Sequence, residues 1–315
     1  MFKVLQYTTI SPLGIGGVEK YLSNLNTELA AQGNNVQVSS KWVEGADIIH
    51  THGDLAPLRA GVSSLRRNGL WIPVFHGTTL GRMLACKEYL SPSGLKGIAK
   101  ERLFLSLSDA AIAVGTQAED ELRKLYFYRK PIRVIPNGSI RFSTTNELPN
   151  QPIFLFLGRS SDRVKNTGLV VNGLSCLRSK YKDLELRMAP GDKETNSSNW
   201  IKKLGPLDQT GIEKELTTSR ILVLASFYEG DSLVLRDAKN AGIPILASKI
   251  RPIEETLADY PNKVFFDPRN LNSFVSAAED TLNKNYVRKI VERPWKLVAQ
   301  EYSDFYRFVA GSRKS

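Results

Sequence analysis

The chain alternates two kinds of hydrophobic pattern. Short apolar runs rich in β-branched residues are followed by longer stretches in which apolar residues recur every three or four positions. The short runs predict strands, and the longer stretches predict amphipathic helices. In the first half of the chain the predicted strands are 4–7, 36–38, 48–49, 72–75, 110–114 and 132–135, and the predicted helices are 18–29, 55–67, 95–107 and 117–126. This alternation is typical of a parallel sheet covered by helices.

A polar, proline-bounded segment at residues 143–152 interrupts the alternation and predicts a linker between two domains. Beyond it, the predicted strands are 153–157, 184–188, 221–225 and 243–247, and the predicted helices are 167–180 and 231–240. The segment 295–309 is rich in aromatic residues, and we expect it to pack back onto the body of the protein. The sequence therefore predicts two α/β domains, residues 1–147 and 148–294.

The composition is that of an ordinary globular protein, with 42% hydrophobic and 24% charged residues. No apolar run reaches the ~18–20 residues that a membrane-spanning helix needs, and the first residues enter a predicted strand rather than a signal peptide. Cys86 and Cys176 lie far apart in the sequence, which argues against a disulfide framework and against a cysteine metal site. We therefore expect a cytoplasmic protein.

The formal net charge of +11 favours anionic ligands or an anionic surface. There is no basic tail and no patch of interleaved basic and aromatic residues, so we expect no nucleic-acid partner. The segment from Arg82 to Arg102 combines basic side chains with leucines and carries only Glu88 and Glu101 as acids. It is a candidate surface for peripheral contact with the inner face of an anionic membrane, and a solvated helix face is the alternative.

The most informative motif follows the apolar run 221–225. Glu229 lies beyond the end of this predicted strand, and Asp237 lies within the next predicted helix. A helix start offers unpaired backbone N–H groups to an anion, and ionised carboxylates accept hydrogen bonds from hydroxyl groups. The motif therefore suits a ligand that carries both phosphate and sugar hydroxyls. The alternative is an ordinary solvated helix with an acid near its N-terminus.

Two further loops follow predicted strands. Gly16 and Gly17 open the first predicted helix, where glycine permits close approach of a phosphate, although the motif is neither a dinucleotide fingerprint nor a P-loop. Arg159 and Lys165 bracket the loop after the first strand of the second domain. A guanidinium fork and a lysine charge near a helix start suit a pyrophosphate. An ordinary connecting loop is the alternative for each.

All three histidines lie at the ends of predicted strands of the first domain. His50 and His52 are two residues apart, so they point to the same side of a strand. His76 ends the run 72–75 and is followed by a glycine, at the edge of a parallel sheet where ligands bind. A zinc site made by the three histidines is one alternative, and hydrogen bonds to the backbone are another. The rest of the chain shows no metal chemistry, so we expect no metal and no cofactor.

Together these pieces resemble the retaining glycosyltransferases of family 4 (glycosyl transferases group 1), whose GT-B fold has two Rossmann-like domains with parallel sheets facing a central cleft. No single motif is specific, but six follow in the family's order: 14–19 (GIGGVE), 47–52 (DIIHTH), 74–77 (VFHG), 134–138 (VIPNG), 158–166 (GRSSDRVKN) and 229–244, which ends in AGIP. The tail 295–315 resembles the family's C-terminal helix, which crosses back to the first domain.

The resemblance implies an acceptor-binding first domain and a second domain that binds a nucleotide-sugar donor, a UDP-sugar or a GDP-sugar. The acceptor would be a glycan, a lipid-linked carbohydrate or another hydroxyl compound. Arg159 and Lys165 would stabilise the diphosphate leaving group in place of a metal, and Glu229 would contact sugar hydroxyls. The backbone N–H groups of Asp231, Ser232 and Leu233 would contact the sugar or the phosphates, and Asp237 would contact the ribose. In the first domain, Gly16 and Gly17 would approach the phosphate, and His76 would contact the transferred sugar.

Two positions depart from the family pattern. Asp237 stands where the family has a glutamate, and Asp231 stands where an apolar residue is common. The shorter side chain of Asp237 either loosens the ribose contact or requires a shifted helix. The extra carboxylate of Asp231 either selects a sugar by hydrogen bonding or repels the diphosphate. The sequence thus predicts a retaining, metal-independent hexosyltransferase. The alternatives are a nucleotide-sugar or glycan-binding module without turnover and a GT-B sugar-nucleotide epimerase.

Overall fold

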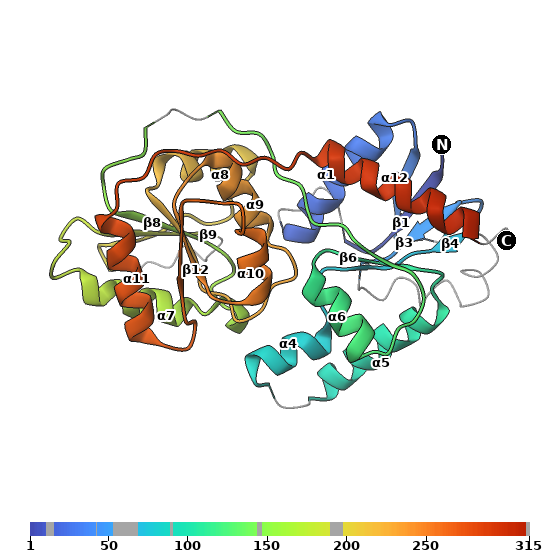
Figure 1. Ribbon diagram of the computed structural model, residues 1–315, viewed down its shortest axis with the longest axis horizontal. Coiled ribbons are helices and arrows are strands. Elements are labelled where there is room, and N and C mark those ends of the chain that lie inside the picture. Colours follow the sequence, from blue (N-terminus) through green and yellow to red (C-terminus); the bar gives the residue numbers. More distant parts are fainter. Residues whose placement is uncertain are drawn as a thin grey trace. The chain divides into compact units, whose positions relative to one another are not determined.

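The structure is a computed structural model that describes residues 1–10, 16–41, 43–52, 69–88, 91–143, 147–189 and 198–312. The chain divides into two compact units, one formed by Met1–Gly138 with Pro294–Ser315 and the other by Ser139–Arg293. Each unit is an α/β body built on parallel strands (Figure 1). The predicted helix at 55–67 lies outside the described residues. Of the helices that the structure describes, none is long and apolar enough to cross a membrane.

The first unit alternates strands and helices, as its hydrophobic pattern predicts. Its elements are β1 Lys3–Tyr7, α1 Gly17–Ala31, β2 Asn35–Ser39, β3 Ile48–His50, β4 Leu70–Trp71, β5 Val74–Phe75, α4 Thr79–Cys86, α5 Pro92–Leu107, β6 Ala111–Ala113, α6 Thr116–Lys124, β7 Ile132–Val134 and α12 Trp295–Ser312. The strands form two parallel sheets, with the orders β2-β1-β3-β4 and β5-β6-β7.

The predicted strand 72–75 is replaced by β4 and β5, which are separated by Ile72 and Pro73. Proline has no backbone N–H and cannot donate within a strand. The backbone still pairs on both sides, because Ile72 N donates to Ile49 O at 2.9 Å and Ile112 N donates to Pro73 O at 3.0 Å. The segment 70–75 therefore joins the two sheets. Since all these strands are parallel, the loops after β1, β3 and β5 leave from the same edge.

The aromatic C-terminal segment is part of the first unit, where α12 lies beside α1 (Figure 1). Helix α1 buries Tyr21 and three leucines at helical spacing. The ring of Trp295, the first residue of α12, lies 5.7 Å from the ring of Tyr21 in an edge-to-face arrangement. Tyr302 and Tyr306, one turn apart on α12, are fully buried. The aromatic positions of the tail are thus its packing face.

The second unit contains one six-stranded parallel sheet with the order β10-β9-β8-β11-β12-β13. Its elements are β8 Ile153–Leu157, the 3-10 turn η1 Arg163–Lys165, α7 Thr167–Leu177, β9 Glu185–Ala189, β10 Ile201–Lys203, α8 Gln209–Thr218, β11 Ile221–Leu224, α9 Leu233–Ala241, β12 Ile245–Ser248, α10 Arg251–Thr256, β13 Lys263–Phe266 and α11 Leu271–Asn283. The sequence analysis missed the elements within 201–218 and 251–283. Counted within the unit the order is 3-2-1-4-5-6, the Rossmann order, which reverses direction between β8 and β11.

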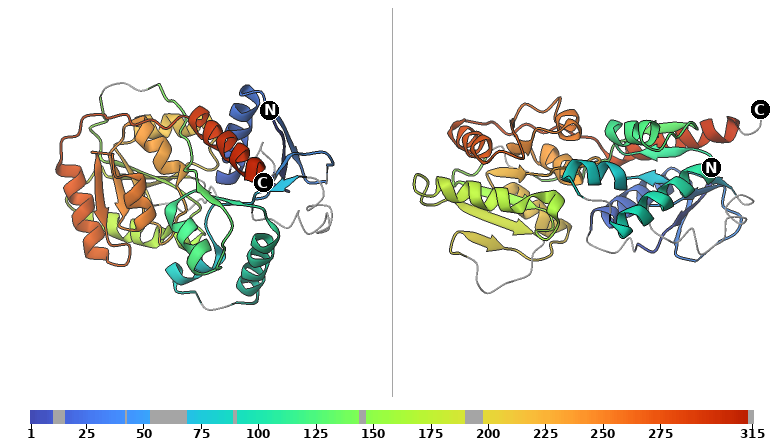
Figure 2. Two further views of the ribbon diagram at one scale, coloured as in Figure 1. Left: turned by 45° about the vertical axis from the view of Figure 1, so that its right-hand side comes forward. Right: turned by 90° about the horizontal axis from the view of Figure 1, so that it is seen from below.

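Alternating residues of β8 face two hydrophobic cores. Phe154 and Phe156 pack with residues of α7 and α11 on one face of the sheet. Leu155 and Leu157 pack with residues of α8, α9 and α10 on the other face. Figures 1 and 2 show the sheet between these two layers of helices. A strand buried on both faces explains the continuous apolar run of β8.

The boundary between the units lies nine residues earlier than the sequence analysis placed it, after Gly138 rather than after residue 147. Ile140 N donates to Asp237 Oδ1 at 3.2 Å, and Asn240 Nδ2 donates to Ile140 O at 2.7 Å. Phe142 is buried in the core of the second unit. The residues directly before the predicted linker are therefore packed into that unit, and residues 144–146 of the linker lie outside the described residues.

Candidate active site

Two loops of the second unit meet at the point where the strand order reverses, one after β8 and one after β11. Val164, in the turn η1, is buried, and its carbonyl oxygen accepts a hydrogen bond of 2.9 Å from Phe227 N. Asn166 follows with a φ of 53°, a left-handed conformation that asparagine adopts more readily than most residues. The chain thus turns into α7 immediately after Lys165, which fixes the position of that lysine.

Lys165 and Glu229 form a salt bridge across these two loops, with 2.7 Å between Lys165 Nζ and Glu229 Oε1. Ser226 Oγ donates to the same oxygen at 2.6 Å. The exposed fractions of the two charged side chains are 22% and 11%, so the pair is largely shielded from water. Glu229 Oε2 has no hydrogen-bond partner within the part of the chain that the structure describes. The site therefore presents a cation next to an available acceptor oxygen.

The first turn of α9 follows this pair. Ser232 is the N-cap residue, and its hydroxyl makes no capping hydrogen bond. Leu233 is the first helical residue, so the backbone N–H groups here are among those that an α-helix leaves unpaired. Arg159 lies on the other loop with a side chain that is 76% exposed, and its guanidinium is 3.6 Å from Asp162. The structure thus joins Lys165 to Glu229 directly and gives Arg159 a separate partner.

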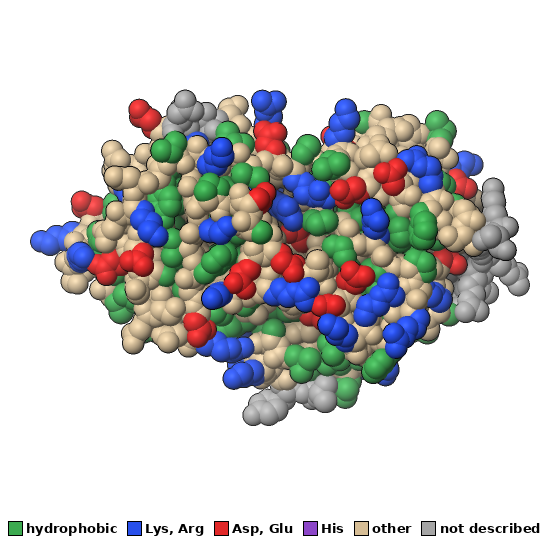
Figure 3. Space-filling model, in the orientation of Figure 1, with side chains coloured by type: hydrophobic (Ala, Val, Ile, Leu, Met, Phe, Trp, Pro, Cys, Tyr) green, Lys and Arg blue, Asp and Glu red, His purple; other side chains and the backbone are tan. Residues whose placement is uncertain are grey.

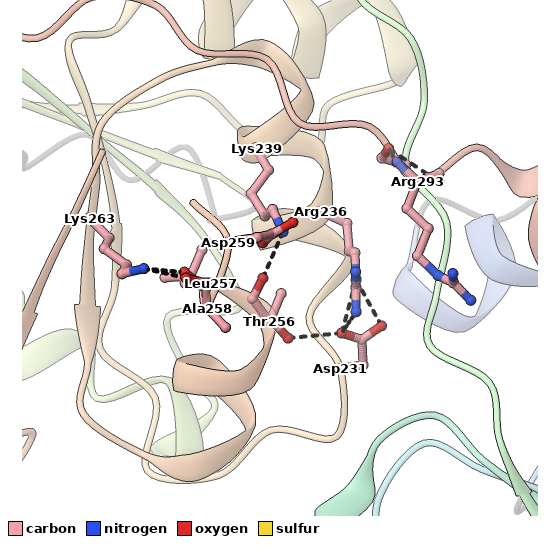
Figure 4. Close-up of polar contacts among 10 residues, drawn as sticks. Asp231, Arg236, Lys239, Thr256, Leu257, Ala258, Asp259, Lys263 and Arg293 are labelled. Carbon is pink, nitrogen blue, oxygen red and sulfur yellow. Dashed lines mark hydrogen bonds and ion pairs between the residues drawn. The ribbon is translucent and has the colours of Figure 1, made fainter. Parts of the chain in front are cut away.

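The carboxylate of Asp231 is held from two sides (Figure 4). Arg236 donates from Nη2 to Asp231 Oδ1 at 2.9 Å and from Nε to both carboxylate oxygens, at 3.1 and 3.2 Å. Thr256 Oγ1 of α10 donates to Asp231 Oδ1 at 3.1 Å. The exposed fraction of the Asp231 side chain is 2%. The carboxylate that departs from the family pattern is therefore paired with a cation inside the unit.

A second contact joins α9 to α10. Lys239 Nζ donates to Thr256 O at 2.8 Å and to Asp259 Oδ1 at 2.5 Å, as Figure 4 also shows. Burial lowers the pKa of Lys239, and the neighbouring Asp259 acts in the opposite direction. Together with the Asp231–Arg236 pair, this contact fixes the orientation of α9 relative to α10.

Asp237, the predicted ribose contact, is the fifth residue of α9 and is buried. Its carboxylate accepts a hydrogen bond from the backbone N–H of Ile140, so it helps to attach the segment that enters the second unit. Asp237 thus has a structural role that the sequence analysis missed.

Gly16 and Gly17 start α1 in the first unit as its N-cap and first helical residue. A Cβ at position 16 would collide with the carboxylate of Glu19, whereas a Cβ at position 17 would meet open space. Space at Gly16 is thus occupied by the flexible end of the Glu19 side chain, whereas Gly17 leaves room. Gly14 and Ile15 of the same motif lie outside the described residues.

His50 uses both of its ring nitrogens within the first unit. Nδ1 lies 2.6 Å from Ile72 O and therefore donates, so Nε2, at 2.7 Å from Tyr306 OH, accepts from that hydroxyl. Burial lowers the pKa of His50 to about 4. Both nitrogens of His50 are thus engaged within the unit, which argues against the zinc alternative with three histidines.

His52 and His76 form a second group beside it. His52 Nδ1 lies 3.4 Å from His76 Nε2, and His52 Nε2 lies 2.7 Å from Gln6 Oε1. Burial and the nearby imidazoles lower the pKa of His52, and burial lowers the pKa of His76 to about 4. Both rings are therefore neutral at pH 7.

Several of these partners were missed by the sequence analysis. Tyr21 and Tyr306 occupy positions that helical spacing explains as core, and nothing marks Gln6 as a partner of a histidine. Ser226 directly follows the apolar run 221–225, and this position is the one sequence signal that could have identified it. Arg236 is five residues from Asp231, a separation that does not match the i,i+3 or i,i+4 pairs of a helix.

Two family models match consecutive parts of the chain. The model described as Glycosyltransferase Family 4 matches residues 39–139, and the model described as Glycosyl transferases group 1 matches residues 140–294. The chain belongs to glycosyltransferase family 4. The family predicted from the six ordered motifs is thereby confirmed.

Two curated proteins are similar in sequence to this chain. A phosphatidyl-myo-inositol mannosyltransferase of Propionibacterium freudenreichii is 26% identical over 229 residues, which cover 70% of this chain and 57% of the relative. A D-inositol 3-phosphate glycosyltransferase of Paenarthrobacter aurescens is 24% identical over 279 residues, which cover 78% of this chain and 67% of the relative. The match thus spans little more than half of the mannosyltransferase.

Solved structures of glycosyltransferases share the fold. A sucrose-phosphate synthase from Thermosynechococcus elongatus has a TM-score of 0.78 and 17% identity, and the match covers 98% of this chain and 100% of that one. A glycosyltransferase from Rickettsia africae has a TM-score of 0.66 and 15% identity, with 98% of each chain covered. The predicted GT-B fold class, with two Rossmann-like α/β units, is confirmed.

Proposed function

We propose that this protein is a retaining, metal-independent hexosyltransferase that moves a hexose from a UDP-sugar or GDP-sugar to a hydroxyl acceptor. The observation that carries the proposal is the Lys165–Glu229 pair. It lies where the strand order of a Rossmann sheet reverses, between β8 and β11, and this is the position at which such sheets bind nucleotides.

The second unit offers complementary groups for each part of the donor. Lys165 and the exposed Arg159 supply positive charge for the diphosphate, which is the role that a divalent metal has in other transferases. The first-turn N–H groups of α9, at Ser232 and Leu233, and the backbone N–H of Asp231 supply further donors to phosphate or sugar. Glu229 Oε2 accepts from a sugar hydroxyl, and Asp237 is the proposed ribose contact.

The first unit supplies the acceptor side. Gly17 and Gly16 allow a phosphate to approach the start of α1 once the Glu19 side chain moves, and His76 contacts the transferred sugar. In the reaction the bond between the anomeric carbon and the phosphate oxygen breaks, and a bond to the acceptor oxygen forms on the same face of the sugar. The acceptor hydroxyl proton passes to the departing phosphate oxygen. Lys165 and Arg159 stabilise the negative charge that develops there.

A thermal-shift panel tests donor binding on the full chain. The panel contains UDP, GDP, ADP and their glucose and mannose derivatives, each with and without EDTA. We expect one base to raise the melting temperature, by an amount that EDTA leaves unchanged. Stabilisation by none of the compounds contradicts the proposal, and stabilisation that EDTA abolishes contradicts its metal independence. Inositol phosphates and phosphatidylinositol are the first acceptors to add, since both relatives are named for inositol compounds.

Turnover is tested by following hydrolysis or transfer of the stabilising donor. Lys165→Ala should lower kcat by roughly 10²–10³-fold, the range for loss of one group that stabilises developing charge. Lys180→Ala is the matched control, because Lys180 forms an ion pair with Glu279 within the same unit but on an exposed surface. A stabilising donor with no turnover supports the binding module instead, and a donor converted to its epimer supports the epimerase.

We further propose that α4 and α5 of the first unit bind an anionic membrane surface. Leu84, Leu95 and Leu103 are 61%, 52% and 39% exposed, and Lys96 and Arg102 are exposed beside them. Figure 3 shows basic and hydrophobic side chains together over the region of these helices. Both acids of the segment have partners: the buried Glu101 accepts from Thr79, and Glu88 forms an exposed salt bridge with Arg82. The outer face is therefore basic and apolar, which suits anionic lipid.

Vesicle co-sedimentation tests this contact. The double substitution Lys96→Gln, Arg102→Gln should weaken binding to vesicles of phosphatidylglycerol and phosphatidylcholine roughly 30-fold, at about 1 kcal/mol for each basic residue. Lys180→Gln, on the second unit, should leave binding unchanged. Binding that does not depend on the phosphatidylglycerol fraction, or that the double substitution leaves intact, contradicts the proposal.

A further inference from the structure

We propose that His52 is a positioning residue, which fixes the ring orientation and the tautomer of His76 through a hydrogen-bond chain that starts at Gln6. This inference rests on the proposed function, in which His76 contacts the transferred sugar. It assigns roles to two residues, His52 and Gln6, that do not themselves contact a substrate.

The chain starts at the Gln6 side chain, which is fully buried in β1. Gln6 Nε2 donates to Asn26 Oδ1 of α1 at 2.9 Å, and this directs Gln6 Oε1 toward His52 Nε2 at 2.7 Å. A carbonyl oxygen only accepts hydrogen bonds. His52 therefore carries its proton on Nε2, and in the neutral ring its Nδ1 has a lone pair.

The next link transfers this constraint to His76. His52 Nδ1 and His76 Nε2 are 3.4 Å apart, and since His52 Nδ1 is unprotonated it must accept. His76 therefore carries its proton on Nε2, which leaves Nδ1 as an acceptor. Because burial lowers the pKa of both imidazoles, neither ring gains a second proton at neutral pH that would remove this constraint. His76 Nδ1 is thus suited to accept a hydrogen bond from a sugar hydroxyl, not to donate one.

The orientation of the His76 ring is fixed from another side by Tyr21. The two rings are 4.6 Å apart and nearly perpendicular, at 87°. Tyr21 is itself held by a hydrogen bond between its hydroxyl and that of Tyr302 on α12. His52 itself lies two residues beyond the end of β3, and the groups that support it and His76 come from β1, α1 and α12, regular elements of the first unit. Rigid elements place a contacting group more reproducibly than a loop does by itself.

The tautomer is measured directly by long-range proton–nitrogen NMR on the ¹⁵N-labelled full chain, without donor. The protein has three histidines, and their ring-nitrogen signals are assigned with single substitutions. We expect His76 to be protonated on Nε2 alone at pH 7. Protonation on Nδ1, or a mixture of the two tautomers, overturns the proposal.

The kinetic test uses His52→Phe, which keeps an aromatic ring and removes both nitrogens. We expect kcat to fall ~10–100-fold, the range for a misplaced contact near the reacting centre, with less than about threefold change in the KM for donor. His76 should then show both tautomers. His50→Phe is the matched control, since His50 is equally buried two residues away but bonds to Ile72 and Tyr306 instead. It should lower stability and leave kcat and the His76 tautomer unchanged.

Gln6→Met provides a second test if His52→Phe does not fold. Methionine has nearly the shape of glutamine but no carbonyl oxygen, so His52 is no longer held in one tautomer. The expected changes have the same direction as in His52→Phe. Unchanged kcat and tautomer in these variants, or an equal loss of kcat in His50→Phe, overturns the proposal. Since the tautomer is measured without donor, a wild-type protein that fails to turn over any donor contradicts the proposed function and leaves the NMR result interpretable.

Discussion

Removing Arg236 tests how α9 is held in the second unit. In Arg236→Met the side chain keeps its length but loses its charge and its N–H donors. The substitution leaves the Asp231 carboxylate, which is 2% exposed, without the cation that contacts both of its oxygens. Burial prevents water from replacing that cation, so the effect should be much larger than for a surface ion pair.

The size of the effect follows from this burial. Breaking a buried pair by removing one partner costs about 3–5 kcal/mol, whereas an exposed pair contributes about 0–1 kcal/mol. For a unit of this size, 1 kcal/mol corresponds to roughly 2–4 °C in melting temperature. Arg236→Met should therefore lower the melting temperature of the second unit by about 6–20 °C.

Differential scanning calorimetry of the full chain measures this shift. Arg251→Met is the matched control, because Arg251 and Glu255 form an ion pair on α10 whose side chains are 51% and 40% exposed. The control should shift the melting temperature by no more than about 4 °C. If Arg236→Met shifts it no further than Arg251→Met, the Asp231–Arg236 pair does not stabilise the unit and the argument from burial is wrong.

Three further predictions concern the site, a helix contact and pH. Lys165→Ala should reduce turnover and also lower the free energy of unfolding, because it leaves the Glu229 side chain, which is 11% exposed, without its cation. The loss should be smaller than the ~3–5 kcal/mol of a fully buried pair, since Lys165 is 22% exposed. Gly173→Ala places a methyl group against Phe274 and should cost about 1–3 kcal/mol in urea denaturation. Gly168→Ala, on the same helix in open space, should stabilise by up to about 1 kcal/mol. His50 and His76 have folded pKa values near 4, below the unfolded value of 6.5. The unfolded chain therefore binds protons that the folded chain does not, so the melting temperature should fall as the pH decreases from 6.5 to 4, and less steeply in His50→Gln.

The hydrophobic pattern predicts those helices and strands that bury one face, or both faces, along their whole length. The runs of β8 and β11 and the helical spacing of α1 show this, since each is buried as its periodicity requires. The segment 70–75 divides into β4 and β5 because β4 pairs with β3 and β5 pairs with β6. The hydrophobic pattern of the sequence does not show these pairings. The early unit boundary likewise depends on a tertiary contact, between Ile140 and Asp237.

The same distinction applies to the site. Motif order placed Lys165 and Glu229 on two loops, and the backbone bond from Phe227 to Val164 is what brings the loops together. Sequence spacing could not reveal that Asp231 pairs with Arg236, because Asp231 precedes the helix and Arg236 is its fourth residue. The partners of His76 are distributed over β1, α1 and α12, far apart in the chain, so only the fold identifies them.

Because Asp231 is paired with Arg236, we expect neither of the two effects that its departure from the family pattern suggested. A carboxylate that repels the diphosphate must be uncompensated, and this one is bonded to a guanidinium. The double substitution Asp231→Leu, Arg236→Met removes both charges together, and replacing a buried pair by apolar residues is often neutral for stability. The net charge near α9 is then unchanged, so the dissociation constant of the stabilising nucleotide-sugar, measured by isothermal titration calorimetry, should stay within about threefold of wild type. A tenfold increase in affinity would show that Asp231 repels the donor despite Arg236, and a tenfold loss would show that it contributes to sugar selection.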